Sequence, residues 1–142
     1  MADERRKFEV SLVTPDGAVF EGEAEMIIVP GDAGEIGILA RHAPLVAMLK
    51  AGSTRVHVTG SDVREFATGP GFFKVETDRA LALVDDAVSA KEIDVPRAES
   101  QLAAAKAELA RVESGESDAD KWQIEQRVKH AENQLAVASG TR

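Results

Sequence analysis

The residue pattern changes character near position 88, and this change constrains the fold more than any other feature. Before it, apolar residues alternate in short runs that are broken by Gly, Pro and Asp; after it, Gly and Pro are scarce and Ala, Glu and Lys dominate. A period of two is typical of strands, whereas a period near 3.6 is typical of helices. We therefore expect two domains, residues 1–88 and residues 89–142, that differ in secondary structure.

The first part predicts many short strands. Phe8, Val10 and Leu12 alternate before the turn signal Pro15-Asp16-Gly17, and further turn signals follow at 30–31, 59–62 and 69–71. The other expected strands contain Val19-Phe20, Met26–Val29, Ile36–Leu39, Val56–Val58, Val63–Phe66, Phe72–Val75 and, as the last strand, Leu81–Val84. Short strands with regular turns favour a β-sandwich or a barrel.

The second part predicts two helices with one apolar stripe each. The stripes consist of Ala98, Leu102, Ala105, Leu109 and Val112, and of Ile124, Val128, Ala131, Leu135 and Ala138. A polar loop at 114–118 separates them, and Asp94 or the segment Ser89–Glu92 could cap the first helix. The predicted fold is thus mainly β plus α: an N-terminal β-sandwich followed by an antiparallel two-helix hairpin.

Such a hairpin buries little area because its stripes are narrow and rich in Ala. Two short helices are marginally stable alone. We expect the hairpin to dock on the β domain, bind a ligand or lie on a partner, so it is a candidate for movement.

Composition excludes several classes of function. The net charge of −8 argues against nucleic acid, because phosphate binding needs clustered Lys and Arg. The absence of Cys excludes disulfides and thiolate chemistry. No run approaches the roughly 20 apolar residues of a membrane span, so we expect membrane association only through partners.

The residues that could carry chemistry form no catalytic or metal-binding constellation. The glycines of segment 31–37 lack the Gly-Lys-Ser/Thr of a phosphate loop. The three histidines (42, 57 and 130) show no metal-ligand spacing, and Asp85-Asp86 fits a solvated strand end better than an acid/base pair. We therefore expect neither an enzyme nor a metal site.

Several motifs in order resemble the ε subunit of bacterial F-type ATP synthases. They are Phe20-Glu21-Gly22-Glu23-Ala24, Val29-Pro30-Gly31, Gly34–Leu39, His42-Ala43-Pro44-Leu45, Gly69-Pro70-Gly71-Phe72 and Leu81–Asp86. With the expected hairpin, the resemblance covers roughly residues 7–138.

The resemblance implies a non-catalytic central-stalk subunit of the proton-transporting ATP synthase, peripheral on the cytoplasmic face of the bacterial cell membrane. Its sandwich would bind the rotating γ subunit and the c ring, with Glu35 and His42 in the loop that faces these partners. Its hairpin would either fold on the sandwich or extend along γ into the catalytic α/β head and oppose ATP hydrolysis. Lys106, Arg111, Arg127 and Lys129 are the candidates for contacting the head.

Some members of the family bind ATP on the folded hairpin through an Ile/Leu-Asp-x-x-Arg-Ala motif, which Ile93, Asp94, Arg97 and Ala98 match. Members that bind ATP well carry further arginines where this chain has Ala104, His130 and Gln134. The resemblance therefore implies at most a weak regulatory ATP site at Asp94 and Arg97, and no other cofactor.

Spacing alone leaves a second interpretation open. The chain could be a free β-sandwich that binds a small ligand, with the helices acting as a dimerisation coiled coil. That alternative predicts a concentration-dependent dimer, whereas a rotor subunit should be monomeric when isolated.

Overall fold

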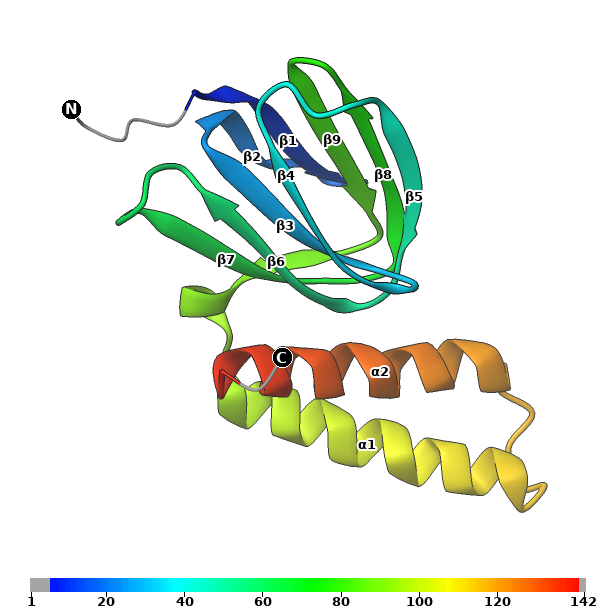
Figure 1. Cartoon of the computed structure of the whole chain (residues 1–142). Helices are drawn as coiled ribbons and strands as arrows, with labels where there is room; N and C mark the ends of the chain where they lie inside the picture. The colour runs from blue at the N-terminus through cyan, green and yellow to red at the C-terminus, as the bar shows by residue number, and fades with distance from the viewer. Residues whose placement is uncertain (1–5, 141–142) are drawn as a thin grey trace.

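The computed structural model describes residues 6–140 as a β-sandwich that rests on a helical hairpin (Figure 1). The ten strands are β1 Phe8–Thr14, β2 Gly17–Ala24, β3 Met26–Gly31, β4 Gly34–Leu39, β5 Leu45–Leu49, β6 Gly52–His57, β7 Val63–Thr68, β8 Gly71–Glu76, β9 Arg79–Val84 and β10 Ala87–Ser89. A 3-10 turn η1 (Ala90–Glu92) leads to α1 (Val95–Glu113) and α2 (Lys121–Ala138).

The strands form one hydrogen-bonded series that folds over into two layers. Its order is β10-β7-β6-β3-β5-β8-β9-β1-β2, and β4 pairs with β3. The series turns the corner at Gly31, which pairs with Leu49 of β5. Neighbouring strands are antiparallel except β1 and β9, which run parallel.

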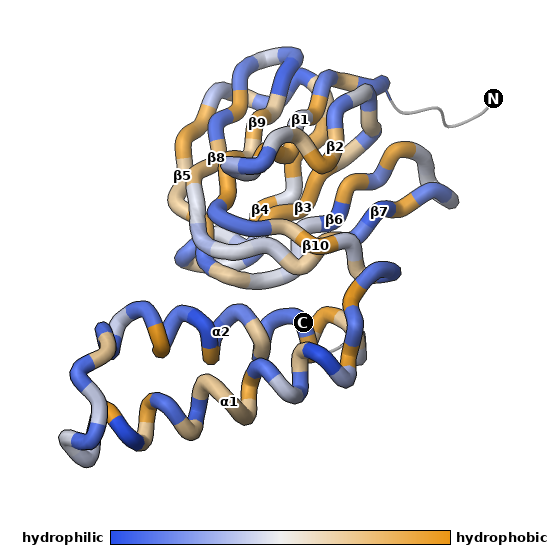
Figure 2. The backbone as a smooth tube through the Cα atoms, turned by 180° about the vertical axis from the view of Figure 1, so that it is seen from behind, coloured by the Kyte–Doolittle hydropathy of each residue, from blue (hydrophilic) through white to orange (hydrophobic). Residues whose placement is uncertain are grey.

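The core lies between the two layers and comes entirely from the sandwich. Side chains of alternate positions point inward, so hydrophobic and hydrophilic residues alternate along the strands in Figure 2. Aliphatic side chains supply most of the core, in keeping with an aromatic content of 4%. Its largest fully buried members include Phe73, Leu12, Ile27 and Ile38.

The two helices form the antiparallel hairpin expected from the stripes. Asp94 caps α1 by accepting a hydrogen bond from the Arg97 backbone N–H at 3.0 Å, and Asp120 caps α2 in the same way through Trp122. Ser89 makes no side-chain capping bond, so the alternative cap is wrong. Helix α2 lies between α1 and the sandwich (Figure 1).

The structure corrects three details of the sequence prediction. Strand β5 was not predicted, and β10 follows the strand that was expected to be the last. In α2, Val137 is buried and Ala138 is exposed. Val137 is buried because α2 packs on two partners, so its apolar surface is wider than a stripe that faces α1 alone.

Candidate interaction surfaces of the sandwich and the hairpin

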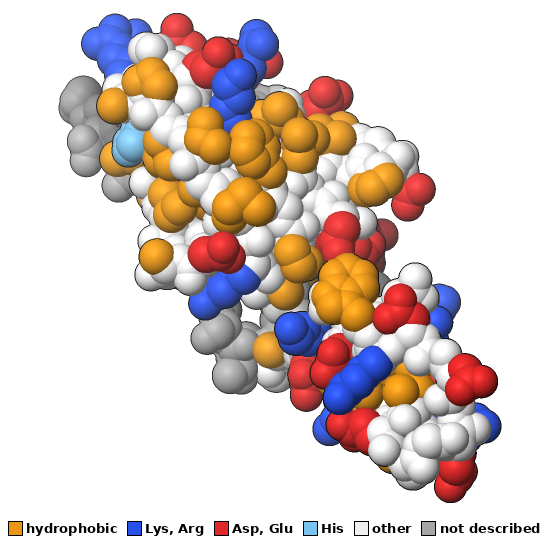
Figure 3. Space-filling model, turned by 90° about the vertical axis from the view of Figure 1, so that its right-hand side faces the viewer, with side chains coloured by type: hydrophobic (Ala, Val, Ile, Leu, Met, Phe, Trp, Pro, Cys, Tyr) orange, Lys and Arg blue, Asp and Glu red, His pale blue; other side chains and the backbone are white. Residues whose placement is uncertain are grey.

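An apolar face covers the outer side of β5, β8 and β9. The register places Met48, Phe72 and Leu83 side by side across the three strands, and Val46 is the next outward position of β5. Val46 and Met48 are 62% and 59% exposed. Figure 3 shows hydrophobic side chains gathered on this side of the sandwich. Contiguous exposed apolar surface marks interaction sites, so we name these four residues the apolar face.

Glu35 and His42 do not share a loop, because Glu35 lies at the start of strand β4 and His42 follows the end of that strand. Glu35 lies on β4 and accepts a hydrogen bond from Arg55 Nη2 at 2.9 Å. His42 follows the strand, and its Nδ1 lies 2.6 Å from the Ala43 carbonyl oxygen. Arg41, which precedes it, has a φ of 63°, a left-handed conformation that turns the chain sharply. The two residues therefore present separate contact points to a partner.

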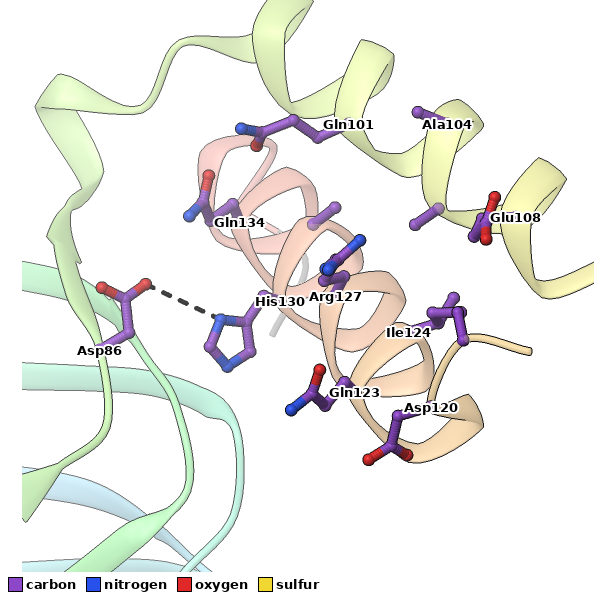
Figure 4. A pocket seen from close by; sticks show the side chains of 13 residues that line it. Asp86, Gln101, Ala104, Glu108, Asp120, Gln123, Ile124, Arg127, His130 and Gln134 are labelled. Carbon is purple, nitrogen blue, oxygen red and sulfur yellow. Dashed lines mark ion pairs between the residues drawn. The ribbon is translucent and has the colours of Figure 1, made fainter. Parts of the chain in front are cut away.

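An open groove of about 750 Å³ lies between the two helices and Asp86 of the sandwich. Figure 4 shows Arg127, His130 and Gln134 of α2 along one side and Ala104 of α1 on the other. The carboxylates of Asp86, Glu108 and Asp120 also line it, so the groove contains three acidic side chains and one arginine.

A smaller pocket of about 300 Å³ brings Asp94 and Arg97 together. Asp86 and Glu92 line it too, so three carboxylates surround one guanidinium. Phosphate recognition favours clustered cations and helix N-terminal amides. The Arg97 amide is already occupied by Asp94, which leaves this pocket poorly suited to a polyphosphate.

Few side chains hold the hairpin on the sandwich. Asn133 Nδ2 donates to the carbonyl oxygens of Gly52 and Thr68 at 3.2 and 3.1 Å. His130 lies 3.4 Å from Asp85 and 3.9 Å from Asp86. The polar part of this contact is thus small.

An ion pair that lies away from these contacts joins Asp62, in the turn before β7, to Arg64 on β7. Arg64 donates from Nε and Nη2 to the Asp62 carboxylate at 3.2 and 3.1 Å. This bidentate contact lowers the pKa of Asp62 and raises that of Arg64. Within residues 6–140, no three His, Asp or Glu side chains gather into a metal site, and neither helix is long and apolar enough to cross a membrane.

Comparison with known proteins identifies the family. Residues 7–90 match the model of the ATP synthase Delta/Epsilon chain β-sandwich domain. The ATP synthase epsilon chain of Rubrobacter xylanophilus is 35% identical over 97% of this chain and 96% of its own length. That of Halalkalibacterium halodurans is 40% identical over 91% of this chain and 95% of its own.

This chain belongs to the ATP synthase epsilon chain family. A chain in the Euglena gracilis mitochondrial ATP synthase structure, which comprises OSCP, F1 and the c-ring, shares the fold with a TM-score of 0.75. It is 23% identical, and the match covers 96% of this chain and 85% of that one.

The basic residues singled out on the epsilon-family hairpin are exposed but do not form one cluster. Arg111 pairs with Glu108 at 3.2 Å on α1, where Lys106 also lies. Arg127 lines the groove between the helices, and Lys129 lines a cavity that faces the β5–β6 loop. Their contact with the catalytic head remains a prediction.

Sequence reasoning missed two features of this structure, the apolar face and the contact of Asn133 with the sandwich. The apolar face was signalled by the unbroken apolar run Leu45–Leu49, because an antiparallel strand that is apolar at every position has an apolar outer side. Asn133 stood out as a poor helix former in mid-helix. Its partners lie 81 and 65 residues away, so no local pattern could name them.

Proposed function

We propose that this chain is the non-catalytic ε subunit in the central stalk of a proton-transporting ATP synthase, where it links the γ subunit to the c ring. The apolar face is the observation that carries the proposal. A family member that works as a free monomer would have no use for four outward apolar side chains, two of which are more than half exposed.

The apolar face fits the γ subunit as its occupant. Its residues form a band across three strands, and Lys74 and Leu81 continue it beside Val46. A band with an apolar centre and charged surroundings has the anatomy of a protein interface. Glu35 and His42 are the proposed additional contacts with γ and the c ring. This assembly would place the chain on the cytoplasmic face of the bacterial cell membrane.

The hairpin is the proposed regulatory element. Its contact with the sandwich is small, so docked and extended positions can differ by a few kcal/mol, as a two-state switch requires. When it extends, Lys106, Arg111, Arg127 and Lys129 become available to the acidic surface of the α/β head. The carboxylates around Asp94 and Arg97 favour weak ATP binding there at most.

The binding test uses a catalytic head that contains γ and has lost its own small subunit. We expect the full chain to bind one-to-one, and the double change Val46→Glu and Met48→Glu to weaken binding at least 100-fold, because two charges would be buried without partners. The measurement is a titration of the head with labelled chain.

Val63→Glu is the matched control. Val63 is 39% exposed on β7, outside the apolar face, so this change should leave binding within about threefold. Equal loss in both variants would show general misfolding. Full binding by the double variant would refute the apolar face as the γ surface.

A further inference from the structure

Both ring nitrogens of His130 face carboxylates where the hairpin meets the sandwich. Nε2 lies 3.4 Å from Asp85 Oδ2, and Nδ1 lies 3.9 Å from Asp86 Oδ2. Figure 4 shows the ring pointing from α2 toward Asp86. Nε2 is buried and makes no hydrogen bond with the described residues. The imidazole is thus held between two negative charges, with one nitrogen shielded from water.

This arrangement suits the protonated imidazole. A neutral ring carries one N–H and can offer a proton to one carboxylate only, whereas the imidazolium offers one from each nitrogen. Histidine is also the side chain that ordinarily gains its charge between pH 5 and 8. Protonation should therefore strengthen the contact between α2 and the segment that joins β9 to β10.

The other charged groups near the ring are four acids and three bases, a small acidic excess that acts in the same direction as the two aspartates. Asp32 and Lys50 of the sandwich line the cavity on one side of the ring with Lys129 and Glu132 of α2. The groove on its other side contains Arg127 and the acids Glu108 and Asp120. Among residues 6–140, the ion pairs of His130 are those with Asp85 and Asp86. These two carboxylates therefore set the sign of the effect.

The glycine at position 69 leaves room for Asp85 beside the ring. A Cβ atom at Gly69 would lie 1.8 Å from Asp85 Oδ1 and 3.3 Å from His130 Nε2. Any larger residue at position 69 would have to displace the Asp85 carboxylate from this place. Among residues 6–140, the other polar contacts between α2 and the sandwich are the two hydrogen bonds from Asn133, so a change at His130 alters a large share of the polar docking contact.

We propose that His130, Asp85 and Asp86 form a proton-sensitive latch: acid holds the hairpin docked on the sandwich, and rising pH releases it. The stabilisation is present when the ring is charged and is lost as pH rises through the range in which histidine deprotonates. The regulatory meaning rests on the proposed function. There, acidification would keep the hairpin away from the head and leave ATP hydrolysis, which exports protons, uninhibited.

Thiol labelling of the isolated full chain measures the latch. The chain has no Cys, so Val137→Cys introduces a single thiol at a position that is 4% exposed in the docked state. Its labelling by a maleimide requires undocking, whereas Ala138→Cys is exposed and reports the intrinsic reactivity of the thiol at each pH. The ratio of the two rates gives the undocked fraction.

We expect this ratio to rise about threefold to tenfold from pH 5.5 to 8, the effect of two partly exposed ion pairs. In the His130→Gln background, and in Asp85→Asn with Asp86→Asn, it should be independent of pH. His42→Gln, which removes a histidine away from the hairpin, should keep the full response.

A flat ratio in the otherwise unchanged chain, or a response that survives His130→Gln, overturns the latch. Neither result bears on binding to the catalytic head, which is measured separately. Conversely, a chain that fails to bind the head but keeps the His130-dependent response would refute the proposed function and leave the latch standing as a property of the fold.

Discussion

Gly71 occupies a position in the sandwich where there is no room for a Cβ atom. It opens β8 opposite Val84 of β9, and a Cβ at this position would lie 1.9 Å from the Leu83 carbonyl oxygen and 2.7 Å from the Val84 Cα. The obstructing atoms belong to the backbone, so no side-chain rotation can make room. The residue therefore permits the close approach of two strands that carry the apolar face.

Gly71→Ala should lower the free energy of unfolding by about 2 kcal/mol or more, because β8 and β9 must move apart. Gly60→Ala is the matched control, since a Cβ there meets nothing within 4 Å. It should be neutral or slightly stabilising through the unfolded chain. Urea denaturation of both variants checks the difference, and equal stability would contradict the close approach of the strands.

The hairpin is an element whose internal packing exceeds its attachment to the rest of the chain. Its buried residues include Ala98 and Ala105 of α1 and Ile124 and Ala131 of α2, which occupy the two expected stripes. Because the stripes pack on each other within one chain, the surface that a dimerisation coiled coil would need is already covered. Of the two helices, α2 makes the larger contact with the sandwich, through a few side chains.

Asn133→Ala should raise the undocked fraction of the hairpin. It removes two hydrogen bonds and leaves the Gly52 and Thr68 carbonyls less satisfied, a loss of about 1–2 kcal/mol or roughly a tenfold change. The labelling rate of Val137→Cys measures it. Gln123→Ala is the control, because Gln123 is exposed in the first turn of the same helix. It should leave the rate unchanged.

Local signals were sufficient to predict most elements. Alternation located eight strands, and the acidic cap at Asp94 located the start of α1 within one residue. Strand β5 was missed because Leu45–Leu49 is apolar at every position and does not alternate. Strand β10 has only three residues, too few to show a period.

The candidate sites were less predictable, because they depend on contacts between distant segments. Asp94 and Arg97 lie three positions apart in sequence, and both line one small pocket, while ATP binding there stays a prediction. The carboxylates that line this pocket, and that disfavour a phosphate there, include Asp86 of the sandwich. Likewise, the partners of His130 and Asn133 could be named only after α2 had been placed on the β domain.

At the scale of the whole molecule, the sandwich and the hairpin have separate packing. The hydrophobic core of the sandwich contains residues from Phe8 to Ala87 and none from the helices. The sandwich should therefore fold without the hairpin. This separation allows one part to remain on the stalk while the other changes position.

A chain that ends at Ile93 should bind the γ-containing head within about threefold of the full chain, because the apolar face is intact. The same truncation should raise the ATP hydrolysis rate of the reconstituted head, since the extended hairpin is lost. A binding titration checks the first expectation, and an ATP hydrolysis assay checks the second. Loss of binding would show that the hairpin contributes to attachment, and an unchanged rate would refute its inhibitory role.

The parallel pairing of β9 with β1 has a mechanical consequence. Strand β9 is clamped between β1 and β8, so tension on the hairpin would load its hydrogen bonds in shear. The three residues of β10 lie at the end of the series against β7 and can peel away one bond at a time. Once peeled, residues 87–94 form a tether that reaches about 26 Å. Under tension, the segment that joins the hairpin to the sandwich would therefore lengthen while β9 stays in the sheet.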